Sequence, residues 1–370
     1  MKIGVFHWAF DELGGGEVLA HYLGKALNTK VYSVIKHPKA NELSFEDISD
    51  RIPFAVRLLR KVRSFDYLTW SNIDTTELGD FDAVITSGLT ARALITPPDV
   101  MHVHYNHSPA RWLYDLWHFR RKSKGPIKRN FILPLASEFF RVWDVAVDKR
   151  VDYYFSNSPI TQLRLWKYLK RKSEVLYPPI EVKKYRNKPS EDFFLFIGRL
   201  WQEKNPESAI KACIATKKHL ILIGDKSDKK LVKKYGSNSL IEFKGRVSEQ
   251  EKIELLASCK AVIYPAIAED FGIVPIEALA SGKPVICSNT GFPPIVVANE
   301  RGMITDGTAY GIQEAIIEME NKDYEPDELM SFAERFDFEN FKRKLIFFLN
   351  IFMADFQKKF EGEECKNGNK

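Results

Sequence analysis

The sequence predicts an α/β protein with two Rossmann-like domains, each built on a parallel sheet, that face one another across an interdomain cleft. Short apolar runs alternate with helical segments of about 10 to 15 residues, which is the pattern of βαβ units. The 370 residues suffice for two domains of ordinary size. A proline-containing basic stretch, residues 177–189, is typical of a linker. We therefore expect an N-terminal domain over residues 1–180, a C-terminal domain over residues 190–340, and a C-terminal helix with a polar tail over residues 341–370.

The first domain opens with a βα unit. The apolar run at residues 2–7 predicts a strand, the triple glycine at residues 14–16 predicts a loop, and residues 17–27 predict a helix. Further apolar runs predict buried parallel strands at residues 30–35, 82–86 and 100–105.

The second domain repeats this alternation more regularly. Its predicted strands are residues 193–197, 219–223, 241–243, 261–264 and 284–287. From Met330 onwards the pattern is that of an amphipathic helix.

Composition and segment lengths favour a globular chain in a reducing compartment. Hydrophobic residues make up 45% of the chain, which supports real cores, and charged residues make up 28%. No apolar run approaches the roughly 18 to 20 residues of a membrane-spanning helix, and the apolar start at residues 1–6 is too brief for a signal peptide. The four cysteines show no CxxC spacing and predict neither a zinc site nor a disulfide framework. We expect a cytoplasmic protein.

The net charge of +6 is unevenly distributed. Residues 1–187 hold 29 Lys and Arg against 20 Asp and Glu, a balance of +9, whereas residues 188–370 hold 26 against 29, a balance of −3. The densest basic stretches, residues 57–63 and 120–129, have apolar and aromatic neighbours such as Phe131. Two interpretations stay open for them. They are solvated surfaces, or they attach the chain to an anionic membrane surface, where each basic residue contributes about 1 kcal/mol. Nucleic acid is disfavoured, because the sequence has no base-stacking platform or recognition-helix pattern.

Two glutamates, Glu269 and Glu277, lie eight residues apart. The apolar run before them predicts a strand, and the segment around Glu277 predicts the first turns of a helix. Glu269 then lies in a loop at the carboxyl end of a strand, where open parallel sheets bind ligands. Because the two carboxylates cannot form one acid/base pair on a helix face, we expect them to hold two different hydroxyl-bearing parts of one extended ligand.

Two cations, Arg199 and Lys204, follow the predicted strand at residues 193–197. Asn205 and Pro206 are favourable N-cap and N1 residues, so the cations should lie beside a helix N-terminus. Such an arrangement forms a diphosphate site that needs no metal ion. An Arg and a Lys five residues apart are usually an ordinary surface pair, but the neighbouring glutamate motif favours the diphosphate interpretation.

The glycine loop is a weaker signal. Gly15 and Gly16 open the first helix, where backbone N–H groups can approach phosphate oxygens. A triple glycine in this place can also merely end a strand.

Two patterns suggest metal ligands, and neither is convincing. Strand alternation places His102 and His104 on one face and His107 beyond the strand, with no further ligand nearby in the sequence. Asp80 and Asp82 have the D-x-D form of a metal-binding motif, but they precede a strand, at the wrong edge of a parallel sheet for a ligand. We expect no metal site.

Together these motifs resemble the retaining glycosyltransferases of the family 4 type. The spacing of Glu269 and Glu277 matches the E-x7-E motif, and Arg199 and Lys204 match the G-R-x-x-x-x-K pattern that binds the donor diphosphate. The resemblance is strong over residues 193–290. It implies the GT-B fold, with a nucleotide diphosphate-sugar held mainly by the second domain.

The resemblance also implies a role for each matching residue. Glu277 would accept hydrogen bonds from ribose hydroxyls, and Glu269 from sugar hydroxyls. Backbone N–H groups around Phe271, Gly272 and Ile273 would face the diphosphate or the sugar.

Four further positions match the family pattern. Val247 would lie beside the base of the nucleotide. Gly15 and Gly16 match the glycine pair of the first domain, and His107 matches the histidine loop that faces the donor sugar across the cleft.

The string from His107 through Arg111 and Asp115 resembles a subgroup that contains GDP-mannose-dependent mannosyltransferases of polysaccharide assembly. It implies transfer of a hexose, mannose from GDP-mannose, to a saccharide or lipid-linked saccharide, without a metal or other cofactor. Arg199 and Lys204 suit the charge that grows on the departing diphosphate. The family retains anomeric configuration, and the sequence names no carboxylate nucleophile. We therefore favour same-face attack by the acceptor, with the departing phosphate taking its proton.

Two alternatives stay open. One is a UDP-sugar-dependent transferase with a soluble acceptor. The other is a non-catalytic protein on the same fold that only binds nucleotide sugars.

Overall fold

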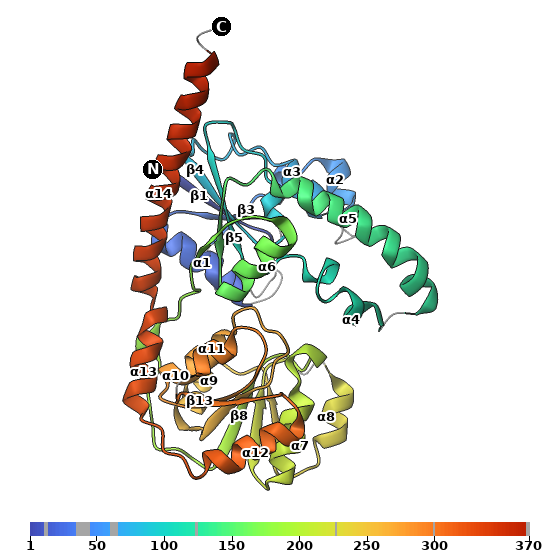
Figure 1. Cartoon of the computed structure of the whole chain (residues 1–370), viewed down its shortest axis with the longest axis vertical. Helices are drawn as coiled ribbons and strands as arrows, with labels where there is room; N and C mark the ends of the chain where they lie inside the picture. The colour runs from blue at the N-terminus through green and yellow to red at the C-terminus, as the bar shows by residue number, and fades with distance from the viewer. Residues whose placement is uncertain are drawn as a thin grey trace. The chain divides into compact units, whose positions relative to one another are not determined.

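The computed structural model describes residues 1–10, 14–34, 45–59, 66–122, 125–225, 228–298 and 300–367. The chain forms two compact units (Figure 1). The first consists of residues Met1–Tyr177 and Phe341–Lys370, and the second of residues Pro178–Asn340. The last segment, expected as a separate helix and tail, therefore groups with the first unit.

A seven-stranded parallel sheet forms the centre of the first unit, in the order β3-β2-β1-β4-β5-β6-β7. Its strands are β1 (Ile3–His7), β2 (Val31–Ser33), β3 (Glu46–Asp47), β4 (Ala83–Ser87), β5 (Met101–Asn106), β6 (Tyr153–Ser156) and β7 (Glu174–Val175). The described α-helices are α1 (Gly15–Leu27), α2 (Phe54–Leu59), α3 (Asp66–Ser71), α4 (Trp117–Lys122), α5 (Leu133–Asp148), α6 (Pro159–Leu169) and most of α14 (Phe338–Asn367). A π-helical turn, η6 (Lys128–Ile132), leads directly into α5.

A six-stranded parallel sheet forms the centre of the second unit, in the order β10-β9-β8-β11-β12-β13. Its strands are β8 (Phe193–Ile197), β9 (His219–Ile223), β10 (Ile241–Gly245), β11 (Ala261–Tyr264), β12 (Val285–Ser288) and β13 (Gly302–Thr305). The described α-helices are α7 (Pro206–Ala215), α8 (Lys229–Tyr235), α9 (Glu249–Ser258), α10 (Ile273–Ala280), α11 (Pro293–Val297), α12 (Ala309–Met319) and α13 (Pro326–Ala333).

Both sheets have the Rossmann strand order, in which the winding reverses beside the first strand. The reversal lies between β1 and β4 in the first unit and between β8 and β11 in the second. At such a point the loops that leave neighbouring strands run in opposite directions and open a crevice outside the carboxyl ends. Each unit therefore presents one place where its topology favours a ligand.

The α/β class and the nine predicted strands are confirmed within the described residues, with ends that agree to about two residues. Four strands were not predicted: β3, β6, β7 and β13. β3 and β7 have two residues each and lie at the sheet edges, so they are too short to give a periodic signal. β6 is Tyr-Tyr-Phe-Ser and β13 is Gly-Met-Ile-Thr, and neither is a continuous aliphatic run.

Helix α14 returns the chain to the first unit. Phe352 stacks on Tyr153, with ring centroids 4.6 Å apart, and its ring centroid lies 5.3 Å from that of Phe155 in β6. The Tyr153 hydroxyl donates to Asp355 at 2.6 Å. Among the described residues, no helix combines the length and apolar character needed to cross a membrane.

Candidate functional site

Lys204 and Glu269 form an ion pair at the carboxyl edge of the second sheet. Lys204 ends the short helix η8 (Gln202–Lys204), which follows β8, and Glu269 lies in the loop after β11. Lys204 Nζ also donates to the hydroxyl of Tyr264, the last residue of β11, at 3.1 Å. The pair therefore bridges the two strands between which the winding reverses.

Burial acts to lower the pKa of Lys204, but Tyr264 and Glu269 outweigh it and hold that pKa above its usual value. Lys204 is thus a permanent cation near neutral pH. Burial, together with the charge of Glu269, raises the pKa of Tyr264, so its hydroxyl stays protonated and can donate.

The backbone of the Glu269 loop is fixed by the segment after β12. The backbone N–H of Phe292 donates to the Glu269 carbonyl at 3.0 Å, and the Ala268 N–H donates to Thr290 Oγ1 at 2.8 Å. Gly291 has φ +81°, and a Cβ there would lie 2.2 Å from the Glu269 carbonyl oxygen. Only glycine allows this close approach.

Gly272 and Ile273 lie at the start of α10, the helix that was predicted around Glu277. Gly272, with φ +77°, is the N-cap residue, and Ile273 is the first helical residue. The first turn of a helix leaves backbone N–H groups without intrahelical partners, and these attract anions. The Phe271 side chain is buried and stacks on Phe292, with centroids 5.4 Å apart, so it belongs to the core and its backbone is the part that can meet a ligand.

Glu277 lies one turn into α10, and its side chain is buried. Its Oε1 accepts from the Tyr185 hydroxyl at 2.9 Å and from Lys252 Nζ at 2.9 Å. Glu269 pairs with Lys204 instead, so the two carboxylates have separate surroundings. Burial acts to lower the pKa of Lys252, but Glu277 and Glu249 outweigh it and raise that pKa, so Lys252 stays charged.

Arg199 leaves the end of β8 through Gly198 and is exposed. Its guanidinium lies over the ring of Trp201, 3.9 Å from the centroid. Gly224, after β9, approaches Gly198 so closely that a Cβ there would lie 2.2 Å from the Gly198 carbonyl oxygen. Val247 follows β10 at the same sheet edge and is partly exposed. The ends of β8 and β9 thus place the Arg199 cation beside two backbone segments that approach one another closely.

A second cluster lies at the carboxyl edge of the first sheet. His107 follows β5, and its Nε2 lies 2.8 Å from Oγ of Ser87, the last residue of β4. His7, the last residue of β1, brings Nδ1 to within 3.2 Å of the same hydroxyl. Gly16 lies against both rings: a Cβ there would be 3.6 Å from His7 and 3.9 Å from His107. The glycine loop and the histidine loop therefore meet.

Both histidines of this cluster are neutral near pH 7. Burial lowers the pKa of His107 to about 4. Burial and the neighbouring His107 lower the pKa of His7 well below its usual range. Two polar atoms beside this cluster, Asn106 Nδ2 and Asn157 Oδ1, are buried and have no hydrogen-bond partner among the described residues. They are available to a polar ligand.

Gly15 is the first residue of α1, and within the described part of the chain nothing lies within 4 Å of a Cβ built there. The Glu17 carboxylate accepts from the Gly14 N–H at 3.1 Å, which satisfies the backbone donor of the N-cap residue. That bond holds the glycine loop against the first turn of the helix.

The histidines and the aspartate Asp82 of the two suspected metal patterns have hydrogen-bond partners within the fold. His102 and His104 lie on one face of β5, as predicted, and both bond Thr86 Oγ1, at 2.8 and 2.9 Å. Asp82 lies at the amino end of β4 and accepts from the Lys2 N–H at 2.5 Å. Within the described ranges, no group of three or more His, Cys, Asp or Glu residues is arranged to hold a metal ion.

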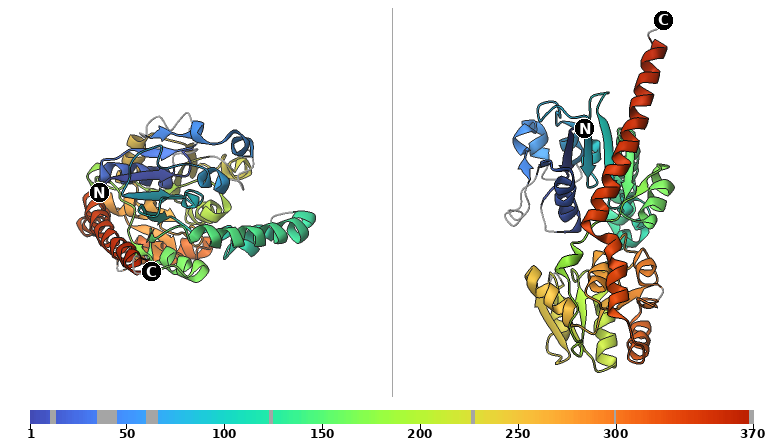
Figure 2. Two further views of the ribbon diagram at one scale, coloured as in Figure 1. Left: turned by 90° about the horizontal axis from the view of Figure 1, so that it is seen from above. Right: turned by 90° about the vertical axis from the view of Figure 1, so that its left-hand side faces the viewer.

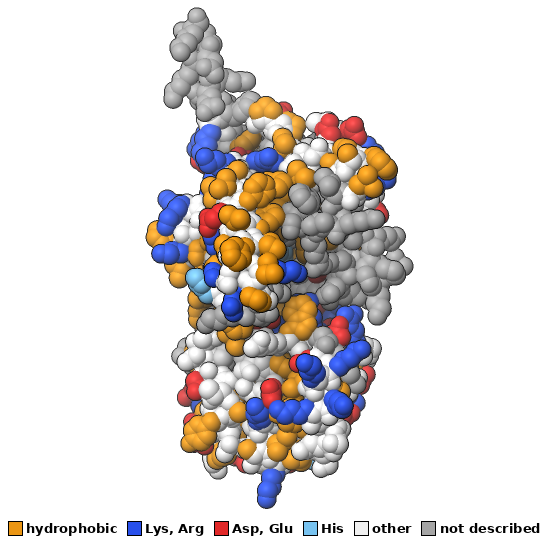
Figure 3. All heavy atoms as spheres, turned by 90° about the vertical axis from the view of Figure 1, so that its right-hand side faces the viewer, with side chains coloured by type: hydrophobic (Ala, Val, Ile, Leu, Met, Phe, Trp, Pro, Cys, Tyr) orange, Lys and Arg blue, Asp and Glu red, His pale blue; other side chains and the backbone are white. Residues whose placement is uncertain are grey.

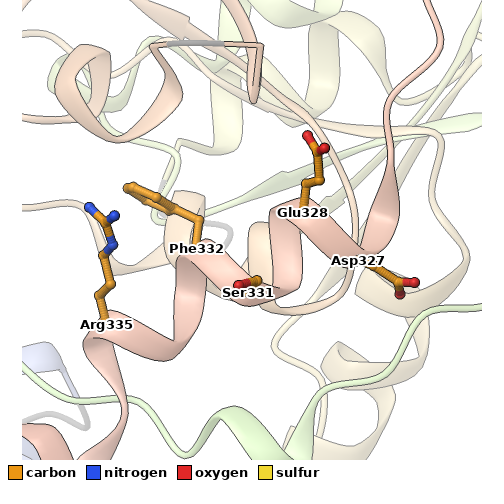
Figure 4. A pocket seen from close by; sticks show the side chains of 5 residues that line it. All are labelled: Asp327, Glu328, Ser331, Phe332 and Arg335. Carbon is orange, nitrogen blue, oxygen red and sulfur yellow. The ribbon is translucent and has the colours of Figure 1, made fainter.

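A hollow elsewhere in the second unit is lined by side chains of α13 and the turn after it (Figure 4): Asp327, Glu328, Ser331, Phe332 and Arg335. None of these was predicted from the sequence, and none of the predicted site residues lines it.

Sequence reasoning missed residues in both clusters. His7 and Ser87 are polar residues at the carboxyl ends of apolar strands, and that position was a usable signal. Tyr185 and Lys252 gave no such signal, because they reach Glu277 from 92 and 25 residues away.

The fold and the motifs have counterparts among known proteins. Residues 179–336 match the family described as Glycosyl transferases group 1. The O-antigen chain mannosyltransferase RfbU of Salmonella typhimurium is 29% identical over 180 residues, which cover 46% of this chain and 51% of RfbU. The alpha-1,3/1,6-mannosyltransferase ALG2 of Kluyveromyces lactis is 23% identical over 360 residues, which cover 81% of this chain and 65% of that protein. The chain thus spans between about half and two thirds of these relatives.

Solved structures agree in fold. HepE of Anabaena in complex with UDP and glucose superposes with a TM-score of 0.70 at 17% identity, over 95% of this chain and 99% of that one. WaaG, a glycosyltransferase involved in lipopolysaccharide biosynthesis, gives a TM-score of 0.59 at 17% identity, over 90% and 93% of the two chains. The predicted fold class is confirmed by these superpositions and by the two parallel sheets. This chain therefore has the GT-B fold, and residues 179–336 match the glycosyl transferases group 1 family.

Proposed function

We propose that this chain is a retaining glycosyltransferase that moves mannose from GDP-mannose to a saccharide or lipid-linked saccharide acceptor. The observation that carries the proposal is the Lys204–Glu269 pair, which places a cation and a carboxylate together where the winding of the second sheet reverses. A nucleotide diphosphate-sugar needs both, because its phosphates are anions and its sugar carries hydroxyl groups. The mannosyltransferase relatives support the choice of sugar.

The donor is proposed to lie across the carboxyl ends of β8 to β11. Arg199 and Lys204 would bind the diphosphate, together with the N–H groups at the start of α10. Glu269 would accept hydrogen bonds from the sugar. Glu277 already accepts two hydrogen bonds at Oε1, which leaves Oε2 for ribose hydroxyls. Val247 would lie beside the base.

The reaction breaks the bond between the anomeric carbon and a phosphate oxygen, and it forms a bond from that carbon to the acceptor oxygen. The electron pair leaves with the nucleoside diphosphate, whose growing charge Arg199 and Lys204 would stabilise. Retention would follow from attack on the same face, with the acceptor proton passing to the departing phosphate. His107, neutral and partly buried, would orient the sugar rather than donate a proton.

Metal independence is part of the proposal and has a direct test. If Arg199 and Lys204 take the role of a divalent cation, turnover of GDP-mannose should be unchanged in EDTA. Loss of activity in EDTA that manganese restores would contradict this role.

We also propose a cytoplasmic location, peripheral on an anionic membrane face. Three buried free thiols, Cys213, Cys259 and Cys287, suit a reducing compartment. The basic surplus of the first half of the sequence supports contact with anionic lipid.

One finding favours a second donor. The HepE structures contain UDP and UDP-glucose, so a UDP-sugar is the alternative, with a soluble acceptor. Thermal-shift measurements with GDP-mannose, UDP-glucose and ADP-glucose decide between them, because the true donor should raise Tm the most. Donor hydrolysis without acceptor then separates an enzyme from a non-catalytic binding protein: no hydrolysis or transfer with any of the three sugars would contradict the proposed function.

A further inference from the structure

The helix that begins before η6 and continues through α5 exposes large apolar side chains along one face. Ile127, Phe131, Leu135, Phe139 and Val142 are 69%, 68%, 77%, 59% and 71% exposed. Their spacing of three or four residues places them on one side of a helix. We call these five side chains the apolar row. A contiguous exposed apolar surface of this kind marks an interaction site rather than chance exposure.

The opposite face of α5 is firmly held, so the apolar row has a defined direction. Asp144 is fully buried and pairs with the buried Arg92. The Tyr114 hydroxyl donates to Asp144 at 3.0 Å, and Arg141 Nε donates to the Leu113 carbonyl at 2.8 Å. Beyond these anchors the amino-terminal part of the helix extends away from the other elements of the first unit (Figures 1 and 2).

The surroundings of the apolar row are basic. Residues 117–149 contain eight Lys and Arg and three Asp and Glu. Two of the three acids, Asp144 and Asp148, are buried near Arg92, and the third, Glu138, pairs with Arg141. Lys128 and Arg129 are exposed in the same helix as the row. Figure 3 shows hydrophobic side chains gathered on the side towards which the helix points, with Lys and Arg side chains around them.

This combination fits one kind of partner. At the surface of an anionic bilayer, apolar side chains enter the boundary between headgroups and acyl chains while cations meet the headgroups. A second copy of the chain fits less well, because two basic surfaces would be brought together and would repel one another. The proposed contact is at the membrane surface, since no helix among the described residues has the length and apolar character of a membrane span.

We infer that the apolar row, with Lys128 and Arg129, is the element that inserts into the interfacial layer of an anionic membrane. The inference rests on the proposed membrane location and names the segment responsible for it. The other basic stretch, residues 57–63, is not part of the inference, because Arg60, Lys61 and Arg63 lie outside the described residues.

Co-sedimentation of the full chain with vesicles tests the inference. We expect binding to phosphatidylcholine vesicles that contain phosphatidylglycerol and much weaker binding to phosphatidylcholine alone. The double variant Leu135→Ser/Phe139→Ser should lose about tenfold or more in partition, because two large apolar side chains no longer leave water. The matched control is Tyr310→Ser on α12 of the second unit, where an apolar ring is also 69% exposed; it should bind as the wild type does.

A second double variant tests the contribution of Lys128 and Arg129 to membrane binding. Lys128→Glu/Arg129→Glu should abolish the preference for phosphatidylglycerol, and added salt should weaken binding by the wild type but not by this variant. Equal partition of wild type and the Leu135→Ser/Phe139→Ser variant, or no binding by the wild type, would overturn the inference. A wild-type dimer that this variant converts to a monomer, without any vesicle binding, would overturn it in favour of a second copy.

Donor hydrolysis, measured without vesicles, distinguishes a failure of the membrane inference from a failure of the proposed function. The variants of the apolar row should hydrolyse GDP-mannose at the wild-type rate, because none of the side chains in the row is among those proposed to hold the donor. Loss of vesicle binding with intact hydrolysis supports the inference. Vesicle binding by a wild type that hydrolyses and transfers no sugar would contradict the proposed function and leave the membrane surface in place.

Discussion

Two residues with the same chemistry, Glu269 and Glu277, lie in different surroundings. The Glu269 side chain is 23% exposed beside Lys204, whereas the Glu277 side chain is 7% exposed and held by Tyr185 and Lys252. Glu269→Gln should therefore lower kcat for donor hydrolysis by about 10²-fold, since Glu269 is the residue we propose to bind the reacting sugar. Glu277→Gln should mainly raise KM.

Steady-state kinetics with the preferred donor checks this contrast. Glu242→Gln, an exposed glutamate in β10, is the control and should behave as the wild type does. Unchanged kinetics in either site variant would remove that residue from the site.

The partly buried His107 predicts a pH dependence of stability. Its pKa in the folded chain, about 4, lies below the usual 6.5, so the unfolded chain binds the proton first. The stability that neutral His107 contributes is complete above about pH 6.5, and it decreases as the pH falls towards 4. In His107→Gln, the decrease of Tm between pH 7 and pH 5 should be smaller by about 3 °C.

Thermal unfolding at several pH values measures that difference. His219→Gln, at the exposed start of β9, is the control and should keep the wild-type pH slope. If Tm changes with pH in the His107→Gln variant as it does in the wild type, the folded chain does not keep His107 neutral.

At the scale of elements, the loop with Glu269 depends on the turn after β12. Gly291→Ala would place a Cβ 2.2 Å from the Glu269 carbonyl oxygen and would force alanine into a left-handed conformation, which costs about 1–2 kcal/mol before any displacement of the loop. We expect a lower Tm and loss of most donor hydrolysis. Gly125→Ala, where nothing described lies within 4 Å of the new Cβ, should change neither. Wild-type hydrolysis in the Gly291 variant would mean that the loop tolerates displacement.

At the scale of the whole molecule, the first unit is completed by the end of the chain. Phe352 in α14 is buried against Tyr153 and Phe155. Phe352→Ala should destabilise the first unit by about 3 kcal/mol, because it removes a large buried ring. Hydrogen exchange followed by mass spectrometry should show faster exchange in β5 and β6, with β8 and β11 unchanged. Phe347→Ala, whose ring is exposed, is the control. Equal acceleration in both sheets would indicate that the units unfold together.

The sequence predicted best those features that lie within a single strand or helix. The strand before Glu269 and the helix that holds Glu277 were both predicted, because each is a local apolar pattern. The partners of Glu277 could not be predicted, because Tyr185 and Lys252 meet it only after the linker and α9 have packed. Ser87 ends its strand, which is a local signal, but its contacts with His7 and His107 form only because β4 lies between β1 and β5.

The sequence by itself determined the α/β class, nine of the thirteen described strands and the two glutamates at a strand-to-helix junction, since periodicity and short motifs depend on neighbours along the chain. The tertiary structure decided which distant side chains meet: Lys204 with Glu269, Tyr185 and Lys252 with Glu277, and His7 with Ser87 and His107. It also decided that α14 completes the first unit. Strand order sets these contacts, and strand order follows from how the sheets pack, not from the local pattern of any one segment.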